Sequence, residues 1–458
     1  MTCLSLPLRR LLTPFASLAL LLAQPAVAQS VLRDAETEAF FRDASAPLVE
    51  AAGLKPGNVD IVLLNDKSIN AFVAGGQAIY IHSGLIRAAD NVEQFQGVVA
   101  HELGHIAGGH IIRSNEGANA ATSISILSLL LGAAAMAAGG GGDAGMAILM
   151  AGQQAAMGKY LAFSRAQESS ADMAGASYLM KSQLSGRGSI EFFRKLMQEE
   201  YRYSSSYASL DPYAQTHPLS RDRISTLEDG YKASPYWTKP SDPLLQARFL
   251  RIKAKLTGYL EDPVVTQRLY PERDQSIPAH YARAYAWHKS AWPDKAAAET
   301  DALIKIAPKD PYFLELQGQI LLESGKPKEA IPALREAVAH SNGEPLIAAI
   351  LGHALIATED DSNYAEAKKV LRIAVQRDNN NPFAWYQLGI VYEHEGDRPR
   401  AALATAERYA LEGQPGPAMH SAEAAMKGIP KDTPDWIRAQ DIAMTSRDAM
   451  DNKKHKKR

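Results

Sequence analysis

The stretch His101-Glu102-Leu103-Gly104-His105 lies in a pattern that predicts a helix from about residue 91 to residue 114. Residues four apart on a helix lie about 40° apart around its axis, so both imidazoles leave the same face. This geometry suits two ligands of a tetrahedral Zn²⁺ ion. Glu102 lies about 100° round from His101 and is expected to reach a metal-bound water without binding the metal. Chance produces the pattern in roughly 2% of such chains, so other parts of the sequence must support it.

A third ligand is expected on a later helix, predicted over about residues 159–184. Glu168 and Asp172 are four apart, so both carboxylates share one face of that helix. Because a catalytic zinc site has three protein ligands and one open position for water, Glu168 is the candidate third ligand. Asp172 is placed to accept a hydrogen bond from a ligand imidazole. The alternative is an acidic face exposed to solvent.

The chain has 458 residues, which is too long for one ordinary core and indicates two or three domains. Its 49 Lys and Arg balance its 51 Asp and Glu, so the composition predicts no nucleic-acid partner. Residues 1–28 are typical of a secretory signal peptide, with Arg9 and Arg10 before an apolar run and Ala26-Val27-Ala28 as the cleavage site. An uncleaved membrane anchor is the alternative, although the run is shorter than the ~20 residues of a span.

Two short segments before the metal helix predict a small sheet. Residues 59–64 are rich in β-branched side chains, and residues 78–82 form a second strand after the turn at Gly75-Gly76. A sheet edge beside a metal site would hold an extended peptide by strand addition. A purely structural sheet explains the pattern nearly as well.

Residues 117–158 are predicted to form an apolar helical hairpin. Residues 117–142 and 144–158 carry no charge, and a run of four glycines interrupts the pattern. The hairpin fits three placements: buried against the catalytic domain, dipping into a membrane face, or spanning a membrane over residues 118–138. The first two are favoured, because serines dilute the first stretch and the second is too short to span back.

The C-terminal half contains an internal repeat. Gly318 and Gly352 are 34 residues apart, and Trp385-x2-Leu388-Gly389-x2-Tyr392 matches the tetratricopeptide signature. Such helix pairs stack into a curved solenoid whose concave face binds peptides or proteins; an unrelated helical bundle is the alternative. We expect repeat units at 277–310, 311–344, 345–381 and 382–415, with three extra residues near 360–363 in an inter-helix turn.

The sequence therefore predicts a mainly α protein with a zincin-like α+β metallopeptidase domain that contains a small β-sheet, followed by an α-solenoid of tetratricopeptide repeats. The expected parts are the peptidase domain at 29–235, a helical linker at 236–276, the repeats at 277–450 and a disordered basic tail at 451–458.

Several motifs, taken in order, resemble one zinc metallopeptidase family, the gluzincin family that includes the CAAX-prenyl proteases and the membrane heat-shock protease HtpX. The resemblance covers about residues 35–230, and the signal peptide and the repeats make the chain similar to the periplasmic branch of that family. The motifs are His101-Glu102-x-x-His105, Gly108-Gly109-His110, Ser164-Arg165-x-x-Glu168-x-x-Ala171-Asp172, and His217-Pro218 with Arg223.

The resemblance implies a periplasmic endopeptidase with one Zn²⁺ per chain that acts in the quality control and assembly of outer-membrane proteins. Its substrates would be unfolded or misassembled outer-membrane proteins. The repeats would dock substrates or the outer-membrane assembly machinery, and peripheral contact with a membrane stays open. Residues expected to contact substrate are Gly76, Ile79, Tyr80 and Ile81.

The tetrahedral oxyanion of such a reaction needs a stabilising partner besides the metal. His217 and Arg223 are the candidates. His217 could instead be a fourth metal ligand that holds the enzyme latent. His110 lies about 140° from His105 on a continuous helix and is not expected to bind metal. His82 is expected either to touch substrate or to lie on the surface.

Two other hypotheses remain open. In the first, the chain is a chaperone or assembly scaffold whose repeats carry the function and whose proteolysis is gated. In the second, it is an inner-membrane protease that keeps its N-terminal segment and uses residues 118–138 as a span.

Overall fold

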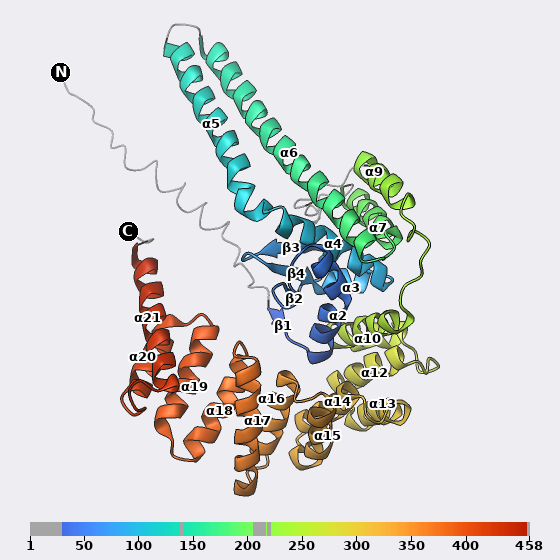
Figure 1. The fold of residues 1–458 in the computed structure, drawn as a ribbon, viewed down its shortest axis with the longest axis vertical. Helices are drawn as coiled ribbons and strands as arrows, with labels where there is room; N and C mark the ends of the chain where they lie inside the picture. Colours follow the sequence, from blue (N-terminus) through green and yellow to red (C-terminus); the bar gives the residue numbers. More distant parts are fainter. Residues whose placement is uncertain (1–29, 138–140, 205–216, 218–220, 456–458) are drawn as a thin grey trace, which may run out of the picture.

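The computed structural model describes residues 30–137, 141–204, 217 and 221–455. The predicted signal peptide and Pro218 lie outside these residues. The described chain is mainly helical, with one small sheet in its N-terminal part and an array of helix pairs in its C-terminal part (Figure 1). The predicted fold class is thus confirmed.

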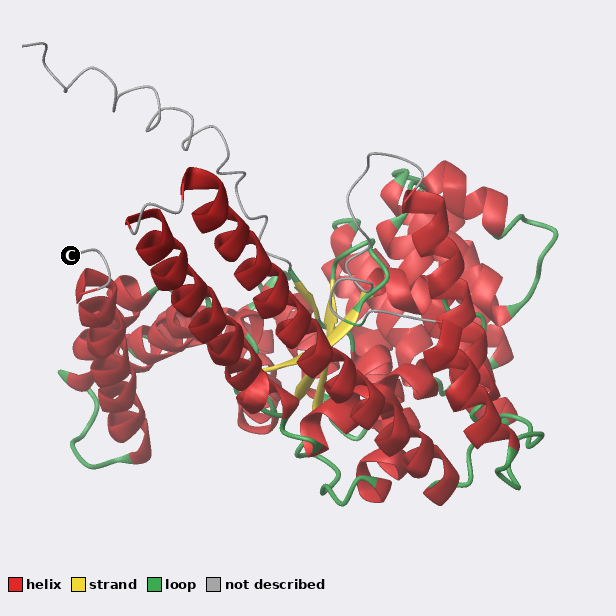
Figure 2. Ribbon diagram, turned by 90° about the horizontal axis from the view of Figure 1, so that it is seen from above, coloured by secondary structure: helices red, strands yellow, loops and turns green. Residues whose placement is uncertain are grey.

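The sheet has four strands in the order β1-β2-β4-β3. β2 and β4 are parallel, and the two outer pairs are antiparallel. Helices lie on either side of these strands (Figure 2). β2 and β4 confirm the two predicted strands, but β4 lies inside the sheet. The strands are β1 (Val31–Leu32), β2 (Asp60–Leu64), β3 (Ala71–Ala74) and β4 (Ala78–His82).

Helix α4 (Val92–Ala107) runs through the centre of the N-terminal part, and all its residues from Val92 to His105 are buried. It packs on the sheet and on α2 (Ala35–Ala51), where Phe95 stacks on Phe41 with ring centroids 5.3 Å apart. The side chain of Asn91 caps its N-terminus by accepting a hydrogen bond from the amide of Gln94. A helix that is buried all round holds its side chains in fixed rotamers, which suits a site that needs defined geometry.

The prediction that this helix continues to residue 114 is wrong. α4 ends at Ala107, and α5 (His110–Ala137) begins after a break at Gly108 and Gly109. Gly109 has φ of +60°, a backbone conformation that L-residues with side chains rarely adopt. The break gives His110 a direction that the helical wheel of α4 does not predict.

α5 and α6 (Gly141–Lys181) pack along each other and project away from the sheet and from the repeats (Figure 1). The hairpin is therefore confirmed, although α6 also continues through the helix expected to begin at residue 159. The placement buried against the domain is wrong, because α6 is the main neighbour of α5. Large apolar side chains exposed on the hairpin are Ile126, Leu127, Leu129, Leu130, Leu131, Met146, Met150 and Met157.

Within the described ranges, no helix has both the length and the apolar character of a membrane span.

α10 (Pro243–Leu260) falls in the expected linker but packs as part of the N-terminal core. Phe249, Ile252 and Leu256 are buried in the same cluster as Phe40. Further helices of this region are α3 (Ser83–Ala88), α7 (Arg187–Ser204), α9 (Arg221–Lys232) and α11 (Pro263–Leu269).

The repeats form helix pairs with the expected units, and a 3₁₀ helix at Asp361–Asn363 occupies the turn predicted to hold the extra residues. α21 continues to His455, so the first part of the expected tail is helical rather than disordered. The pairs are α12 (Ile277–Lys289) with α13 (Pro293–Ile306), α14 (Pro311–Glu323) with α15 (Pro327–His340), α16 (Pro345–Ile356) with α17 (Tyr364–Arg377), α18 (Pro382–His394) with α19 (Arg398–Leu411), and α20 (Pro415–Met426) with α21 (Pro434–His455).

The start of α2 joins the N-terminal part to the repeats. Arg251 on α10 bridges Glu36 at 2.6 Å and Asp310 at 2.8 Å, and the hydroxyl of Tyr281 donates to Glu36 at 2.8 Å. Ala35 is buried against α14 to α16. These contacts pack the two parts of the chain against each other.

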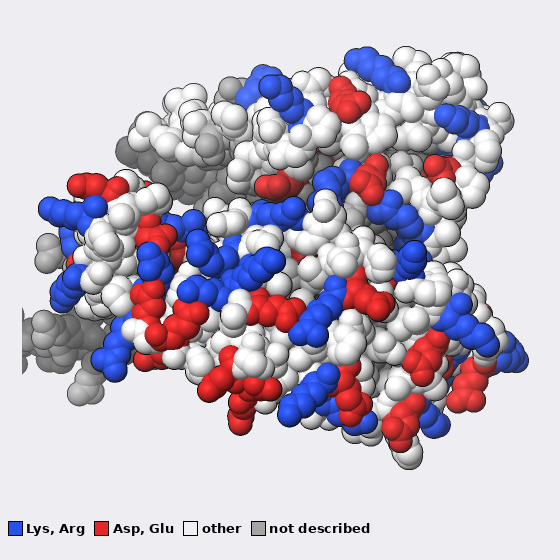
Figure 3. All heavy atoms as spheres, turned by 60° about the horizontal axis from the view of Figure 1, so that its bottom comes forward, with Lys and Arg blue, Asp and Glu red and all other residues white. Residues whose placement is uncertain are grey.

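Basic and acidic side chains intermingle on the face in Figure 3.

Candidate metal centre

Four buried side chains converge at the base of the hairpin. His101 and His105 come from α4, Glu168 from α6, and His217 from the segment between α7 and α9. Each offers one nitrogen or oxygen atom, and these atoms lie within 4.8 Å of one another. Nε2 of His101 is 3.1 Å from Nε2 of His105 and 3.2 Å from Nδ1 of His217. The predicted ligands thus lie together, with His217 among them.

Small residues let α6 approach α4 closely enough for Glu168 to reach the imidazoles. A Cβ on Gly104 would lie 2.6 Å from the carbonyl oxygen of Ala171, and a Cβ on Gly175 would lie 3.0 Å from that of Ala100. Gly104 of α4 meets Ala171 of α6, and Ala100 meets Gly175, so the two helices are antiparallel. Gly104, inside the motif, is therefore the residue that admits the second helix.

Asp172 and Arg223 lie beside the cluster and contact its side chains. Oδ1 of Asp172 lies 2.9 Å from Nδ1 of His101, as the sequence predicts for a residue that orients a ligand. Arg223 donates to Asp172 at 2.8 Å, and its Nη2 lies 3.0 Å from Oε2 of Glu168. The guanidinium thus contacts two carboxylates of the cluster, which favours a role in holding them over the expected contact with an oxyanion.

His110 lies against the cluster, although its spacing from His105 predicts otherwise. Its Nδ1 lies 3.0 Å from Nδ1 of His105, and its side chain is buried. On one continuous helix, His110 would point away from the cluster. The pair Gly108-Gly109 was the signal of a break that turns His110 back.

Burial and the charges of neighbouring side chains shift the pKa values of the clustered residues. Burial opposes ionisation of Glu168, but hydrogen bonds from the three histidines outweigh it and hold its pKa well below the usual range. Burial likewise opposes the charge on His101, but Asp172 and Glu168 raise its pKa to about 10. Burial lowers the pKa of His105, and it lowers that of His110 to about 4 with help from His105. A bound cation would take the place of the proton on His101.

The residues present fit a metal ion. The donors are imidazole nitrogens and a carboxylate, which is the ligand set of zinc and related ions. Glu102 is fully buried, and neither of its carboxylate oxygens has a hydrogen-bond partner in the described part of the chain; its Oε1 lies 3.6 Å from Nε2 of His217, beyond hydrogen-bond distance. A buried carboxylate that accepts no hydrogen bond is costly, and a water held on a metal would donate one to Glu102.

The expected substrate contacts on β4 do not fit strand addition. β4 pairs with β2 on one side and β3 on the other, so its backbone groups are already used. Ile79 and Ile81 are fully buried, and Tyr80 stacks on Phe72 with ring centroids 5.2 Å apart. Gly76 lies in the turn before β4 with φ of +100°. The strand edge nearest these residues belongs to β3.

His82 takes neither of its expected roles. It is buried, and its Nδ1 lies 2.8 Å from the hydroxyl of Ser68. Burial of the ring lowers its pKa. His82 is thus a packed residue at the end of β4.

A buried set of imidazoles and a carboxylate, with the further carboxylate of Glu102 beside it, is the arrangement that the centre of a metallopeptidase needs. Residues 33–230 match Peptidase family M48. The N-terminal part of the chain is thus an M48 peptidase domain, and the protein is a metalloprotease.

Three curated relatives give the wider similarity. The beta-barrel assembly-enhancing protease of Yersinia pestis is 27% identical over 367 residues, which cover 77% of this chain and 71% of that protein. The protein of the same name from Escherichia coli K12 is 26% identical over 359 residues, with the same two shares. Metalloprotease LoiP of Escherichia coli K12 is 30% identical over 183 residues, which cover 39% of this chain and 66% of LoiP.

Two solved structures are similar to part of the chain. YrrB, a TPR protein with an unusual peptide-binding site, is 18% identical with a TM-score of 0.31, covering 39% of this chain and 92% of YrrB. MamA is 19% identical with a TM-score of 0.28, covering 38% of this chain and 96% of MamA. The repeats are identified by the helix pairs and their spacing.

Proposed function

We propose that this chain is a zinc-dependent endopeptidase in which His101, His105 and Glu168 hold the metal and Glu102 is the general base. The observation that carries the proposal is the fully buried carboxylate of Glu102, which accepts no hydrogen bond in the described chain and whose Oε1 lies 3.6 Å from Nε2 of His217, a member of the ligand cluster. A carboxylate in this position can take the proton of a water held at the cluster.

Zinc bound by these ligands would lower the pKa of a water toward about 7 and polarise the scissile carbonyl. Glu102 accepts the proton of the attacking water and passes it to the leaving amine. Asp172 keeps the ring of His101 in the orientation that directs Nε2 to the cluster. Arg223 holds the carboxylates of Asp172 and Glu168 in place.

We infer that an extended substrate pairs with β3 rather than with β4. β3 (Ala71–Ala74) is an outer strand of the sheet, and it packs against α4, which carries the ligand histidines. Strand addition would supply affinity through main-chain hydrogen bonds that do not depend on substrate sequence. This mode suits an enzyme that acts on unfolded chains.

His217 supports a latent state. Its Nδ1 lies 3.1 Å from Oε1 of Glu168 and 3.2 Å from Nε2 of His101, among the ligand atoms. A fourth protein ligand would fill the position that a catalytic zinc keeps open for water. Catalysis would then require His217 to leave the cluster, after which it would be available to the oxyanion.

We place the enzyme in the periplasm, in the quality control and assembly of outer-membrane proteins. The signal-peptide pattern supports export, and two relatives carry the name beta-barrel assembly-enhancing protease. Its substrates would be unfolded or misassembled outer-membrane proteins. The repeats would dock those substrates or the assembly machinery through their concave face.

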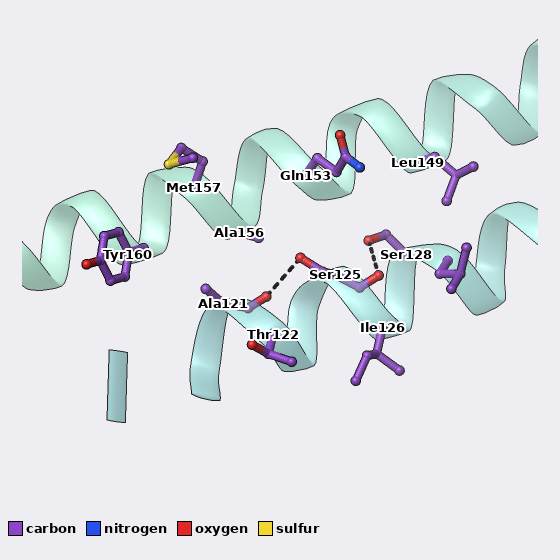
Figure 4. A pocket seen from close by; sticks show the side chains of 11 residues that line it. Ala121, Thr122, Ser125, Ile126, Ser128, Leu149, Gln153, Ala156, Met157 and Tyr160 are labelled. Carbon is purple, nitrogen blue, oxygen red and sulfur yellow. Dashed lines mark hydrogen bonds between the residues drawn. The ribbon is translucent and has the colours of Figure 1, made fainter. Parts of the chain in front are cut away.

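The hairpin supports peripheral contact with a membrane. Its exposed large hydrophobic side chains lie beside a few exposed polar ones such as Gln153. A cavity of about 620 Å³ between its two helices is lined by residues such as Ile126, Leu149 and Met157 (Figure 4). The hydroxyls of Ser125 and Ser128 donate to carbonyl oxygens of their own helix, so they would not need water.

The test is cleavage of an unfolded protein by the mature chain, residues 29–458, beside Glu102→Gln, with zinc measured on both. We expect about one zinc per chain in each and a loss of cleavage of about 10²–10⁴-fold in the variant. Zinc without cleavage by the parent or by His217→Ala would favour the alternative of a chaperone or assembly scaffold. Absence of zinc from both would contradict the metal site.

A further inference from the structure

The two ring nitrogens of His105 have different neighbours. Nε2 faces the ligand cluster and lies 3.3 Å from Oε1 of Glu168. Nδ1 faces outward and lies 3.0 Å from Nδ1 of His110, with the two ring centroids 5.0 Å apart and the rings tilted by 79°. Both rings are buried. His110 therefore meets the nitrogen of His105 that the metal would not use.

We propose that His110 is a positioning residue that fixes the tautomer and the orientation of His105. This inference rests on the proposed role of His105 as a metal ligand. A neutral imidazole that binds metal through Nε2 carries its proton on Nδ1, and that N–H needs an acceptor. Nδ1 of His110 is the atom in position to accept it. Asp172 lies at the corresponding nitrogen, Nδ1, of His101. His101 and His105 would therefore each be oriented by a different residue.

The turn between α4 and α5 is built around the His110 ring. A Cβ on Gly108 would lie 2.4 Å from Nε2 of His110 and within 2.9 Å of two of its ring carbons, so the ring packs on a bare backbone. Gly109, with its positive φ, turns the first residue of α5 back toward α4. From α6, the side-chain amide of Gln167 donates to the carbonyl oxygen of His110 at 3.4 Å.

Three substitutions separate this role from space filling. Asparagine places its Oδ1 near the position of the histidine Nδ1 and so keeps an acceptor. Glutamine places its carbonyl one atom further out, and phenylalanine keeps the ring without any acceptor. A positioning role predicts that His110→Asn retains function while His110→Phe and His110→Gln lose it. A space-filling role predicts that His110→Phe is the best tolerated.

The experiment measures metal binding by the mature chain and the three variants, with His340→Phe as a control at an exposed repeat position. Zinc affinity is measured by chelator competition, and Co²⁺ reports the ligand geometry through its visible absorption. We expect His110→Phe and His110→Gln to lower zinc affinity by about 10–100-fold and to change the Co²⁺ spectrum. His110→Asn should recover most of the affinity, and the control should match the parent.

Gly108→Ala provides a second route to the same result, because its Cβ displaces the His110 ring without removing it. Guanidinium unfolding checks that each variant is folded. Parental affinity and spectrum in His110→Phe would overturn the positioning role while leaving the metal site intact. Failure of the parent itself to bind zinc or Co²⁺ would instead overturn the proposed function, and this inference with it.

Discussion

Nδ1 of His217 lies 3.1 Å from Oε1 of Glu168, inside the group of atoms proposed to bind the metal. The two residues are 49 positions apart and come from different elements, and the His217 ring also lies against the rings of His101 and His105 on α4. If this contact keeps water from the metal, removal of the imidazole should open the site.

His217→Ala is therefore expected to raise cleavage of an unfolded substrate several-fold while zinc content stays near one per chain. The reason is that a three-ligand zinc regains the open position that catalysis needs. Initial rates at saturating substrate provide the measurement. A fall in rate of about 10²-fold or more would instead assign His217 to oxyanion stabilisation.

Removal of the Arg223 guanidinium should lower the free energy of unfolding, because two buried carboxylates lose their cationic partner. Its side chain is only 11% exposed and contacts both Asp172 and Glu168. In metal-free protein, Arg223→Met is expected to reduce the free energy of unfolding by about 3 kcal/mol, because the carboxylates lose their cation. Arg194→Met is the matched control, since Arg194 pairs with Glu228 at half exposure and should change stability by about 0–1 kcal/mol. Equal losses in the two variants would contradict the role of Arg223.

A methyl group on Gly104 should force α6 away from α4. Its Cβ would lie 2.6 Å from backbone of Ala171, whereas a Cβ on Gly158, also helical, meets nothing within 4 Å. We expect Gly104→Ala to destabilise the domain by about 1–3 kcal/mol. It should also weaken zinc binding, because Glu168 is a residue of α6 and moves with that helix. Gly158→Ala should be neutral or stabilising by about 0.5–1 kcal/mol. Denaturant unfolding and chelator competition measure both effects, and unchanged zinc affinity in Gly104→Ala would argue against the coupling.

Membrane contact by the hairpin can be measured by flotation with phosphatidylethanolamine–phosphatidylglycerol vesicles. Leu130 and Leu131 are 63% and 53% exposed, and burial of one leucine contributes about 2 kcal/mol. The double change Leu130→Ser with Leu131→Ser is thus expected to lower vesicle binding at least about tenfold. Leu244→Ser is the control, because Leu244 is 77% exposed but lies on α10. If the double variant and the Leu244→Ser control both float with the vesicles as the parent does, the hairpin does not make the membrane contact.

Glu315 should make stability depend on pH. Burial raises its pKa to about 8, against the opposing charge of Lys255. A pKa raised on folding means that the folded state holds the proton more tightly, so this contribution is complete below the unfolded pKa near 4.3 and is lost as pH rises toward 8. Between pH 6 and 8, Glu315→Gln should therefore remove a decline of up to about 2 kcal/mol in the free energy of unfolding. Exposed Glu336→Gln is the control, and a parental decline in Glu315→Gln would show that another group causes it.

Regular periods in the sequence determined much of this protein. The spacing of His101 and His105 placed both imidazoles on one face, and the spacing of Glu168 and Asp172 did the same for two carboxylates. The 34-residue period located the helix pairs. These features depend on residues close in sequence, whose relative direction follows from helix geometry alone.

Only the tertiary structure decided the features that depend on order and direction in space. The sheet order makes β3 rather than β4 an outer strand, because β4 pairs in parallel with β2. The break at Gly109 turns His110 onto His105, and helical periodicity does not extend across such a break. The hairpin is exposed because no other element packs along it in the described chain, and its apolar composition alone fits burial, membrane contact or a span equally well.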